Sequence, residues 1–371
     1  MKKRNQTQLV VLMAFFLVHS VVLRSQDGSM LMSPYLQAVT HNSIYVLVES
    51  SSTTPIVVEY GPTKSYGMQA RTESCDTTSS MTFIHNIKIS GLKPNTVYHY
   101  RAVSNNLRSS DAAFRTAPEA GTSFRFAWMA DFRGGVAIHD TIARRVREAK
   151  PVMSLYGGDL AINSSDTSFK KEFFRPNELA LIADVPFFNT TGNHERWTPN
   201  TRAFTQGPAS ASGTQEYYSF DYGDMHVLVL NNELPDSVGT PQYQFALHDL
   251  TNTKMTWKVV IAHRPAYCAG GHAADADMRK MAENIFAPNH VNVVFGGHNH
   301  YFQHSLVDGI HYMVIGSAGA PLYDVKTAPY VVKGAKEYEY AICDVSPSSF
   351  HLMVYNEMGM PLDTLSFKRP R

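Results

Sequence analysis

The segment Val293-Val294-Phe295-Gly296-Gly297-His298-Asn299-His300 carries two histidines directly after an apolar run and a pair of glycines. The run predicts a buried strand over 291–295 that ends just before the histidines. Four other apolar runs end in the same way, on Asp131, Asp159, Asn193-His194 and His263. Ligands of α/β proteins bind at the carboxyl ends of strands, so we expect these side chains to converge on one mouth.

The residue types at these strand ends share one kind of chemistry. A single Asp or Asn at a strand end is explained by a turn or a helix cap, but five polar strand ends together are not. Carboxylate, amide oxygen and neutral imidazole are ligands of Zn²⁺, Mn²⁺ and Fe ions, and no thiolate is in the set. The sequence therefore predicts a metal site at this mouth.

The chain after residue 121 alternates strands with helical segments. Helices are predicted over 138–150, near 243–250 and near 274–286. The predicted strands cover 124–129, 152–156, 185–189, 217–222, 225–231, 257–262, 291–295 and 311–315. This pattern is typical of a layered α/β domain with a mixed sheet, which we assign to residues 122–371.

The preceding segment, residues 30–118, shows short β-rich runs separated by turn residues. Strands are predicted over 43–48, 55–60, 83–89, 97–103 and 112–116, which favours an all-β sandwich. Residues 91–98, a proline-containing turn that leads into Tyr98, resemble the tyrosine corner of a fibronectin type III-like module. We interpret this domain as structural or positioning, with direct substrate binding as the alternative, and residues 117–121 as its linker.

Composition limits the possible partners. The 371 residues leave room for two unequal domains, and a net charge of +1 lacks the basic excess of nucleic-acid binders. We expect no nucleic acid and no acidic membrane surface as partner. Three cysteines far apart, at 75, 268 and 343, form no zinc or redox motif and are interpreted as free thiols.

The first residues resemble an export signal. Lys2, Lys3 and Arg4 precede an apolar run over 9–23, so residues 1–25 are predicted to be a signal peptide. The alternative is a membrane anchor, although the run is short for a spanning helix of about 20 residues. We expect a mature chain without a membrane span, secreted to a bacterial periplasm or cell surface.

Five blocks in this sequence resemble, in order, the metal-ligand blocks of the calcineurin-like metallophosphoesterases. They are Ala130-Asp131, Gly158-Asp159, Gly192-Asn193-His194-Glu195, His263 and Gly297-His298-Asn299-His300. The resemblance is strongest to purple acid phosphatases, whose fibronectin-like amino-terminal domain matches residues 33–37 and 91–98. It implies a four-layer αββα sandwich behind the β-sandwich.

The resemblance also implies a site for two divalent cations, or Fe, Zn or Mn ions, with Asp159 as the bridge. It assigns Asp131 and His300 to the first ion and Asn193, His263 and His298 to the second. Two such ions bind phosphate and supply a hydroxide nucleophile, because a metal lowers the pKa of water from about 15.7 toward roughly 7.

Three further residues are candidates for the catalytic steps. The resemblance implies that His194 and His272 lie where either could stabilise the transition state or protonate the leaving alkoxide. Their alternatives are an oriented structural histidine and a solvated loop histidine, respectively. Arg133 is predicted to clamp phosphate oxygens, with an arginine folded onto a surface carboxylate as the alternative. Glu195 is expected to orient His194.

The sequence departs from the family at the first ion. Ile162 stands where purple acid phosphatases have a tyrosine ligand, and Arg133 where most other members have a histidine. Asn163 is a possible replacement ligand, and His304 stands where the last block usually has arginine. These changes predict a colourless enzyme and argue against Fe(III).

The sequence thus predicts hydrolysis of small phosphate monoesters. A phosphodiesterase or nucleotidase activity at the same site is the first alternative. A binding or adhesion protein on a degenerate scaffold is the second.

Overall fold

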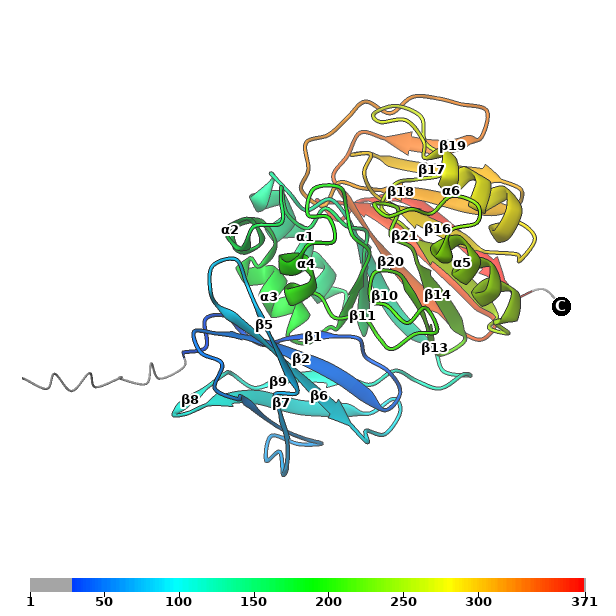
Figure 1. The fold of residues 1–371 in the computed structure, drawn as a ribbon. Helices are drawn as coiled ribbons and strands as arrows, with labels where there is room; N and C mark the ends of the chain where they lie inside the picture. Colours follow the sequence, from blue (N-terminus) through cyan, green and yellow to red (C-terminus); the bar gives the residue numbers. More distant parts are fainter. Residues whose placement is uncertain (1–28, 370–371) are drawn as a thin grey trace, which may run out of the picture.

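The computed structural model describes residues 29–369, so the predicted signal peptide over residues 1–25 lies outside the described part. Two large sheets face each other in the part of the chain after residue 121, with helices covering both outer faces (Figure 1). A smaller all-β module packs at one end of this assembly (Figure 1). This is the predicted order of a β-rich domain followed by a four-layer α/β sandwich.

The amino-terminal module contains nine strands and no helix between residues 35 and 115. They are β1 (Tyr35–Gln37), β2 (Ser43–Ser50), β3 (Val57–Gly61), β4 (Met68–Arg71), β5 (Ser74–Thr77), β6 (Phe83–Ser90), β7 (Val97–Ser104), β8 (Leu107–Arg108) and β9 (Ala112–Arg115). The hydroxyl of Tyr98 accepts a hydrogen bond from the backbone N–H of Lys93 at 3.1 Å. This contact is the tyrosine corner that residues 91–98 predict.

The two parts of the chain share one sheet. Its ten strands run in the order β22-β21-β20-β10-β11-β12-β1-β2-β6-β5. The joint is a parallel pairing of β1 with β12, in which Gln37 lies opposite Phe187. The amino-terminal module is therefore continuous with the central sheet, a link that the predicted linker at 117–121 did not suggest.

The first central sheet takes its remaining strands from both ends of the second domain. They are β10 (Phe124–Met129), β11 (Met153–Tyr156), β12 (Phe187–Asn189), β20 (Glu339–Val345), β21 (Ser349–Asn356) and β22 (Pro361–Lys368). The helical segments on its outer side are α1 (Val136–Glu148), α2 (Asp166–Ser168), a π-helical turn (Phe169–Phe173), α3 (Pro176–Ile182) and α4 (Pro199–Phe204).

The second central sheet has seven strands in the order β13-β14-β15-β16-β18-β17-β19. Their bounds are β13 (Tyr218–Tyr222), β14 (Met225–Val229), β15 (Trp257–Ile261), β16 (Val293–Gly296), β17 (Phe302–Val307), β18 (Ile310–Ile315) and β19 (Val331–Ala335). Its outer helices are α5 (Pro241–Asn252), α6 (Ala276–Met281) and a second π-helical turn (Ala282–Phe286).

Three apolar layers hold the sandwich together. The middle layer, between the sheets, includes the fully buried Trp128 and Trp257 and continues into the amino-terminal module. A second layer packs α1 and α3 on the first sheet, and a third packs α5 and α6 on the other. Burial on both faces explains why the central parallel strands are continuously apolar.

Candidate metal centre

The two candidate carboxylates sit in tight turns at the ends of neighbouring parallel strands. Asp131 follows β10 and Asp159 follows β11, and both have left-handed backbone angles, with φ of 59° and 52°. The N–H of Asp131 donates to the carbonyl of Gly158, and the N–H of Phe132 to that of Asp159, each at 3.0 Å. A left-handed conformation is costly for these residues, and such strain is concentrated at functional sites.

Two glycines let the backbone approach these carboxylates. A Cβ atom at Gly192 would collide with the side chain and the backbone N of Asp159. At Gly297 it would collide with Oδ2 of Asp131. Both positions therefore require glycine because of a close approach.

The first group of donors gathers around Asp131. Its Oδ2 accepts a hydrogen bond from the backbone N–H of His298 at 2.8 Å. Its Oδ1 is buried without a hydrogen bond and lies 3.5 Å from Nε2 of His300. Because Nδ1 of His300 donates to the carbonyl of Pro321 at 2.8 Å, Nε2 faces the site as a lone-pair donor.

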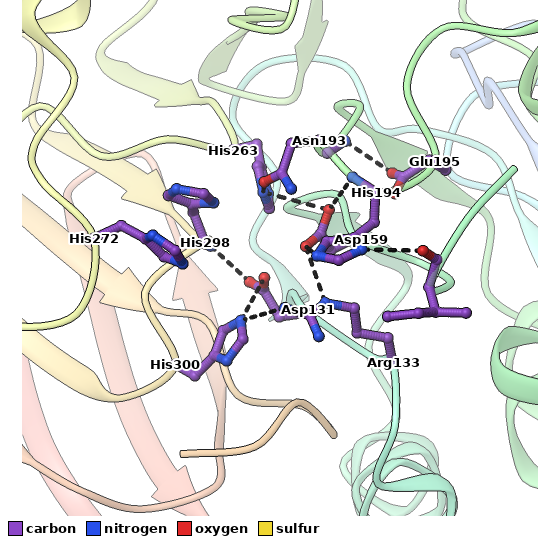
Figure 2. Close-up of polar contacts among 12 residues, drawn as sticks. Asp131, Arg133, Asp159, Asn193, His194, Glu195, His263, His272, His298 and His300 are labelled. Atoms are coloured by element: carbon purple, nitrogen blue, oxygen red, sulfur yellow. Dashed lines mark hydrogen bonds and ion pairs between the residues drawn. The ribbon is translucent and has the colours of Figure 1, made fainter. Parts of the chain in front are cut away.

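The second group gathers around His263. Its Nδ1 donates to the carbonyl of Gly157 at 2.8 Å, so Nε2 points into the site (Figure 2). This Nε2 lies 3.1 Å from Oδ1 of Asn193 and 3.4 Å from Oδ1 of Asp159. Burial lowers the pKa of His263, but Asp159, Asp131 and Glu195 outweigh burial and raise it. When the ring is neutral, Nε2 and the two neighbouring oxygens all present lone pairs, a set that a metal cation satisfies.

Arg133 lies inside the site. Its Nε lies 3.3 Å from Oδ2 of Asp159, and its Nη2 donates to Nε2 of His300 at 3.3 Å (Figure 2). Burial raises the pKa of Asp159, but His263, His194 and Arg133 outweigh burial and lower it. The partners of Arg133 are thus site residues, and the surface-carboxylate alternative does not describe this structure.

His194 is oriented by backbone groups. Its N–H donates to Oδ1 of Asp159 at 3.0 Å, and its Nδ1 donates to the carbonyl of Ile162 at 3.0 Å. The prediction that Glu195 orients this ring is wrong, because Oε1 of Glu195 instead accepts the N–H of Gly192 at 2.8 Å. Burial and the nearby Asp159 raise the pKa of Glu195 to about 8.

His272 lies across the mouth from His194 (Figure 2). Its ring stacks on His298 with centroids 4.4 Å apart. The side chain of Asn299 fixes the loop, because its Oδ1 accepts the N–H of His272 at 2.6 Å and its Nδ2 donates to the carbonyl at 3.2 Å. Burial lowers the pKa of His272, as do His300 and the two nearby arginines.

The donor set fits a metal ion. One oxygen each of Asp131 and Asp159 and one nitrogen of His263 lie within 4.8 Å of one another, and all three residues are buried. The unpaired Oδ1 of Asp131 is the kind of buried orphan atom that a cation satisfies. These oxygen and nitrogen donors suit Zn²⁺, Mn²⁺ or iron.

Comparison with known proteins agrees with this geometry. The family model for calcineurin-like phosphoesterases matches residues 124–302, and the model for the purple acid phosphatase N-terminal domain matches residues 35–116. The chain pairs a calcineurin-like phosphoesterase domain with a purple acid phosphatase N-terminal domain. The resemblance found in the sequence is thereby confirmed.

Relatives and solved structures point the same way. Purple acid phosphatase 21 of Arabidopsis thaliana is 28% identical over 274 residues, covering 67% of this chain and 60% of the relative. The chain therefore spans less than two thirds of that relative's length.

Among solved structures, a purple acid phosphatase from yellow lupin (Lupinus luteus) seeds superposes with a TM-score of 0.78 at 19% identity. It covers 91% of this chain and 74% of the lupin chain. PhoD superposes at 0.66 and 14% identity, covering 91% and 92% of the two chains. At such identities the superpositions establish the fold.

The phosphoesterase domain carries site residues that the sequence did not reveal. Arg264 approaches Nε2 of His298 with its Nη1 at 3.3 Å and is paired with Glu233 through contacts of 2.6 and 3.2 Å. Glu339 is buried beside Asp131, and burial together with that negative charge raises its pKa well above the ordinary value. Arg264 directly follows His263 in the sequence and could have been found from that position. Glu339 lies far along the chain from the ligand blocks, and no sequence motif marks it.

Two of the departures from the family take part in other contacts. The side-chain oxygen of Asn163 accepts the N–H of Ser165 at 2.9 Å, so this side chain stabilises the local turn. His304 lies between Asp363, 2.9 Å from Nδ1, and His311, 2.8 Å from Nε2. The contacts of both residues are with groups outside the donor set.

Proposed function

We propose that this chain is a secreted, metal-dependent phosphatase that hydrolyses small phosphate monoesters. The observation that carries the proposal is that Nε2 of His263 lies 3.1 Å from Oδ1 of Asn193 and 3.4 Å from Oδ1 of Asp159. Carboxylate, amide oxygen and imidazole without a thiolate suit a hydrolytic metal centre.

The ligand positions that the resemblance implies form two adjoining groups that share Asp159. Asp131 and His300 form one, and Asn193, His263 and His298 form the other. When bound, metal at such a site polarises the phosphoryl oxygen and makes water a nucleophile at neutral pH. Hydrogen bonds to the far side of the ligand rings, such as that from His263 Nδ1 to the carbonyl of Gly157, keep the ligand nitrogens pointing into the site.

The remaining polar residues act on the phosphate ester itself. His194, with its ring aimed by the carbonyl of Ile162, and His272, on the opposite side of the mouth, can donate protons or hydrogen bonds to the phosphoryl and leaving-group oxygens. The side chain of Arg133, which is 12% exposed at the mouth, supplies a permanent positive charge. This combination favours an ester that carries two negative charges, as a monoester does.

Secretion is proposed from the apolar run after Lys2, Lys3 and Arg4. Within residues 29–369, no helix has the length and apolar character needed to cross a membrane.

The test is hydrolysis of an aryl phosphate monoester by the full chain after chelation, titrated with Zn²⁺, Mn²⁺ or Fe²⁺. Asp159→Ala should abolish turnover, whereas Asp324→Ala, at an aspartate with a side chain 82% exposed, should retain it. Faster turnover of the diester counterpart would favour the phosphodiesterase alternative. No turnover of either ester with any ion would favour a non-catalytic binding role.

A further inference from the structure

The guanidinium of Arg133 contacts two donors of the group around Asp131. It lies 3.3 Å from Oδ2 of Asp159 and 3.3 Å from Nε2 of His300. Arginine stays charged at every accessible pH, so these contacts place a permanent cation among the ligands. A second cation on the same two donors would face strong like-charge repulsion at this distance.

Few donors remain at this position once Arg133 is in place. Oδ1 of Asp131 is buried with no hydrogen bond among the described residues, while Arg133 contacts the other two donors, Oδ2 of Asp159 and Nε2 of His300. Ile162, at the position of the tyrosine ligand in the resemblance, has a hydrocarbon side chain that is 41% exposed. With Arg133 on the other two donors, the carboxylate of Asp131 alone is short of the three or four protein ligands that hold such an ion.

The neighbouring position keeps its donors. Nε2 of His263 lies 3.1 Å from Oδ1 of Asn193 and 3.4 Å from Oδ1 of Asp159, whereas Arg133 contacts the other oxygen of Asp159, Oδ2. The tautomer of His263 is fixed by the carbonyl of Gly157. This group therefore keeps three donors for an ion.

We propose that the Arg133 guanidinium takes the place of one cation, so that the chain holds a single metal ion, at Asp159, Asn193, His263 and His298. The inference rests on the proposed function and changes its ion count. One divalent ion balances the charges of Asp131 and Asp159, and Arg133 adds one positive charge for the phosphate. A second divalent ion would raise the net positive charge around the same buried carboxylates from one to three.

A second arginine provides a matched control. Arg264 approaches Nε2 of His298 at 3.3 Å, the same distance as Arg133 from His300. Its charge, however, is balanced by Glu233 through two contacts, whereas Arg133 contacts the site residues Asp159 and His300. Removing Arg264 should therefore leave the metal content unchanged.

The experiment measures metal content directly. The full chain, R133H, R133Q and R264Q are stripped with a chelator, dialysed to equilibrium against Mn²⁺, and analysed for bound manganese and by electron paramagnetic resonance. We expect one ion and an uncoupled signal in the wild type and in R264Q. R133H, which removes the guanidinium and supplies an imidazole, should bind two ions with the signal of a coupled pair.

Each result bears on the inference. Two ions in the wild type, or a single ion in both R133H and R133Q with folding verified by circular dichroism, would overturn it. A second ion gained by R264Q would overturn the specific role of Arg133. Ester hydrolysis by a wild type that holds two ions would leave the proposed function standing, whereas one bound ion without any turnover would defeat the proposed function instead.

Discussion

The carbonyl oxygen of Ile162 lies 3.0 Å from Nδ1 of His194 and accepts the hydrogen bond that orients this ring. The N–H of the same residue donates to Oε2 of Glu172 at 2.8 Å. Ile162 thus serves the site through its peptide groups, while its side chain is 41% exposed. A buried carboxylate holds the backbone that aims the histidine, so Glu172 is a positioning residue.

Glu172→Ala is expected to lower kcat about tenfold with little change in KM, because a histidine displaced by even about 1 Å loses much of its effect. Glu172→Gln keeps an acceptor oxygen for the N–H of Ile162 and should restore most of the rate. Steady-state kinetics of both variants, with metal content determined in parallel, check this expectation.

Glu178 offers the control for simple destabilisation. Glu178 is fully buried, whereas Glu172 is 8% exposed. The carboxylate of Glu178 contacts the hydroxyl of Tyr156 and Nε2 of His139. The N–H of Ile162 donates to Glu172 instead. Glu178→Ala should lower the melting temperature while the folded enzyme keeps its kcat. Equal losses of kcat in the two alanine variants would show that Glu172 acts only through stability.

His194→Ala is expected to lower kcat for an aryl phosphate by about 10²-fold, the usual contribution of a positioned proton donor. The ring lies 3.8 Å from Oδ2 of Asp159, close enough to act on a phosphate bound there. An exposed histidine on α5 gives the control, and His248→Ala should keep the wild-type rate. A loss below twofold in His194→Ala would assign the ring a structural role.

Much of the fold was predictable because its core strands are buried on both faces. The strand predicted over 124–129 coincides with β10, and the helix predicted over 138–150 corresponds to α1 (Val136–Glu148). Strands β20 to β22 were missed, although β21 alternates buried and partly exposed residues in the manner of a half-buried strand. The three-residue β1 is too short to give a pattern, and its pairing with β12 is a tertiary contact.

The candidate site also contains residues that a local sequence pattern predicts and residues that only tertiary contacts reveal. The strand-end residues were found because each follows an apolar run, and the structure gathers them at one mouth (Figure 2). Glu172 and Glu339 were not found, because they act through contacts with distant segments and have no local motif. The position of Arg133 among the donors also depends on folding, since it joins residues from three separate strand ends.

Gly192→Ala should weaken Mn²⁺ binding by at least about tenfold, as changes next to metal ligands commonly do. The added methyl group would collide with the side chain and backbone of Asp159. Gly207→Ala is the control, since its Cβ would meet the ring of Tyr218 at 3.3 Å and Cβ of Gln215 at 3.5 Å, both without a collision. Calorimetric titration measures both affinities, and an unchanged affinity in Gly192→Ala would contradict the close approach.

His226 makes stability depend on pH at a place away from the metal centre. Its Nδ1 lies 2.7 Å from Asp221 and its Nε2 2.7 Å from Asp249, on strands β13 and β14 and helix α5. Burial opposes the charged form, but the hydrogen bonds and negative charges of the two aspartates raise the pKa of His226 to about 9. The unfolded value is about 6.5.

A raised pKa in the folded state stabilises the protein fully below about pH 6.5, and this contribution is lost as the pH rises through about 9. His226→Gln should therefore lower the melting temperature by about 2–4 °C at pH 6 and by clearly less at pH 10, where the wild-type imidazole is neutral. Scanning calorimetry across this range tests the expectation. His351→Gln, at an exposed histidine bound to the hydroxyl of Ser366, should show no such trend. A gap between wild type and His226→Gln that stays constant from pH 6 to pH 10 would mean that His226 is uncharged in the folded protein.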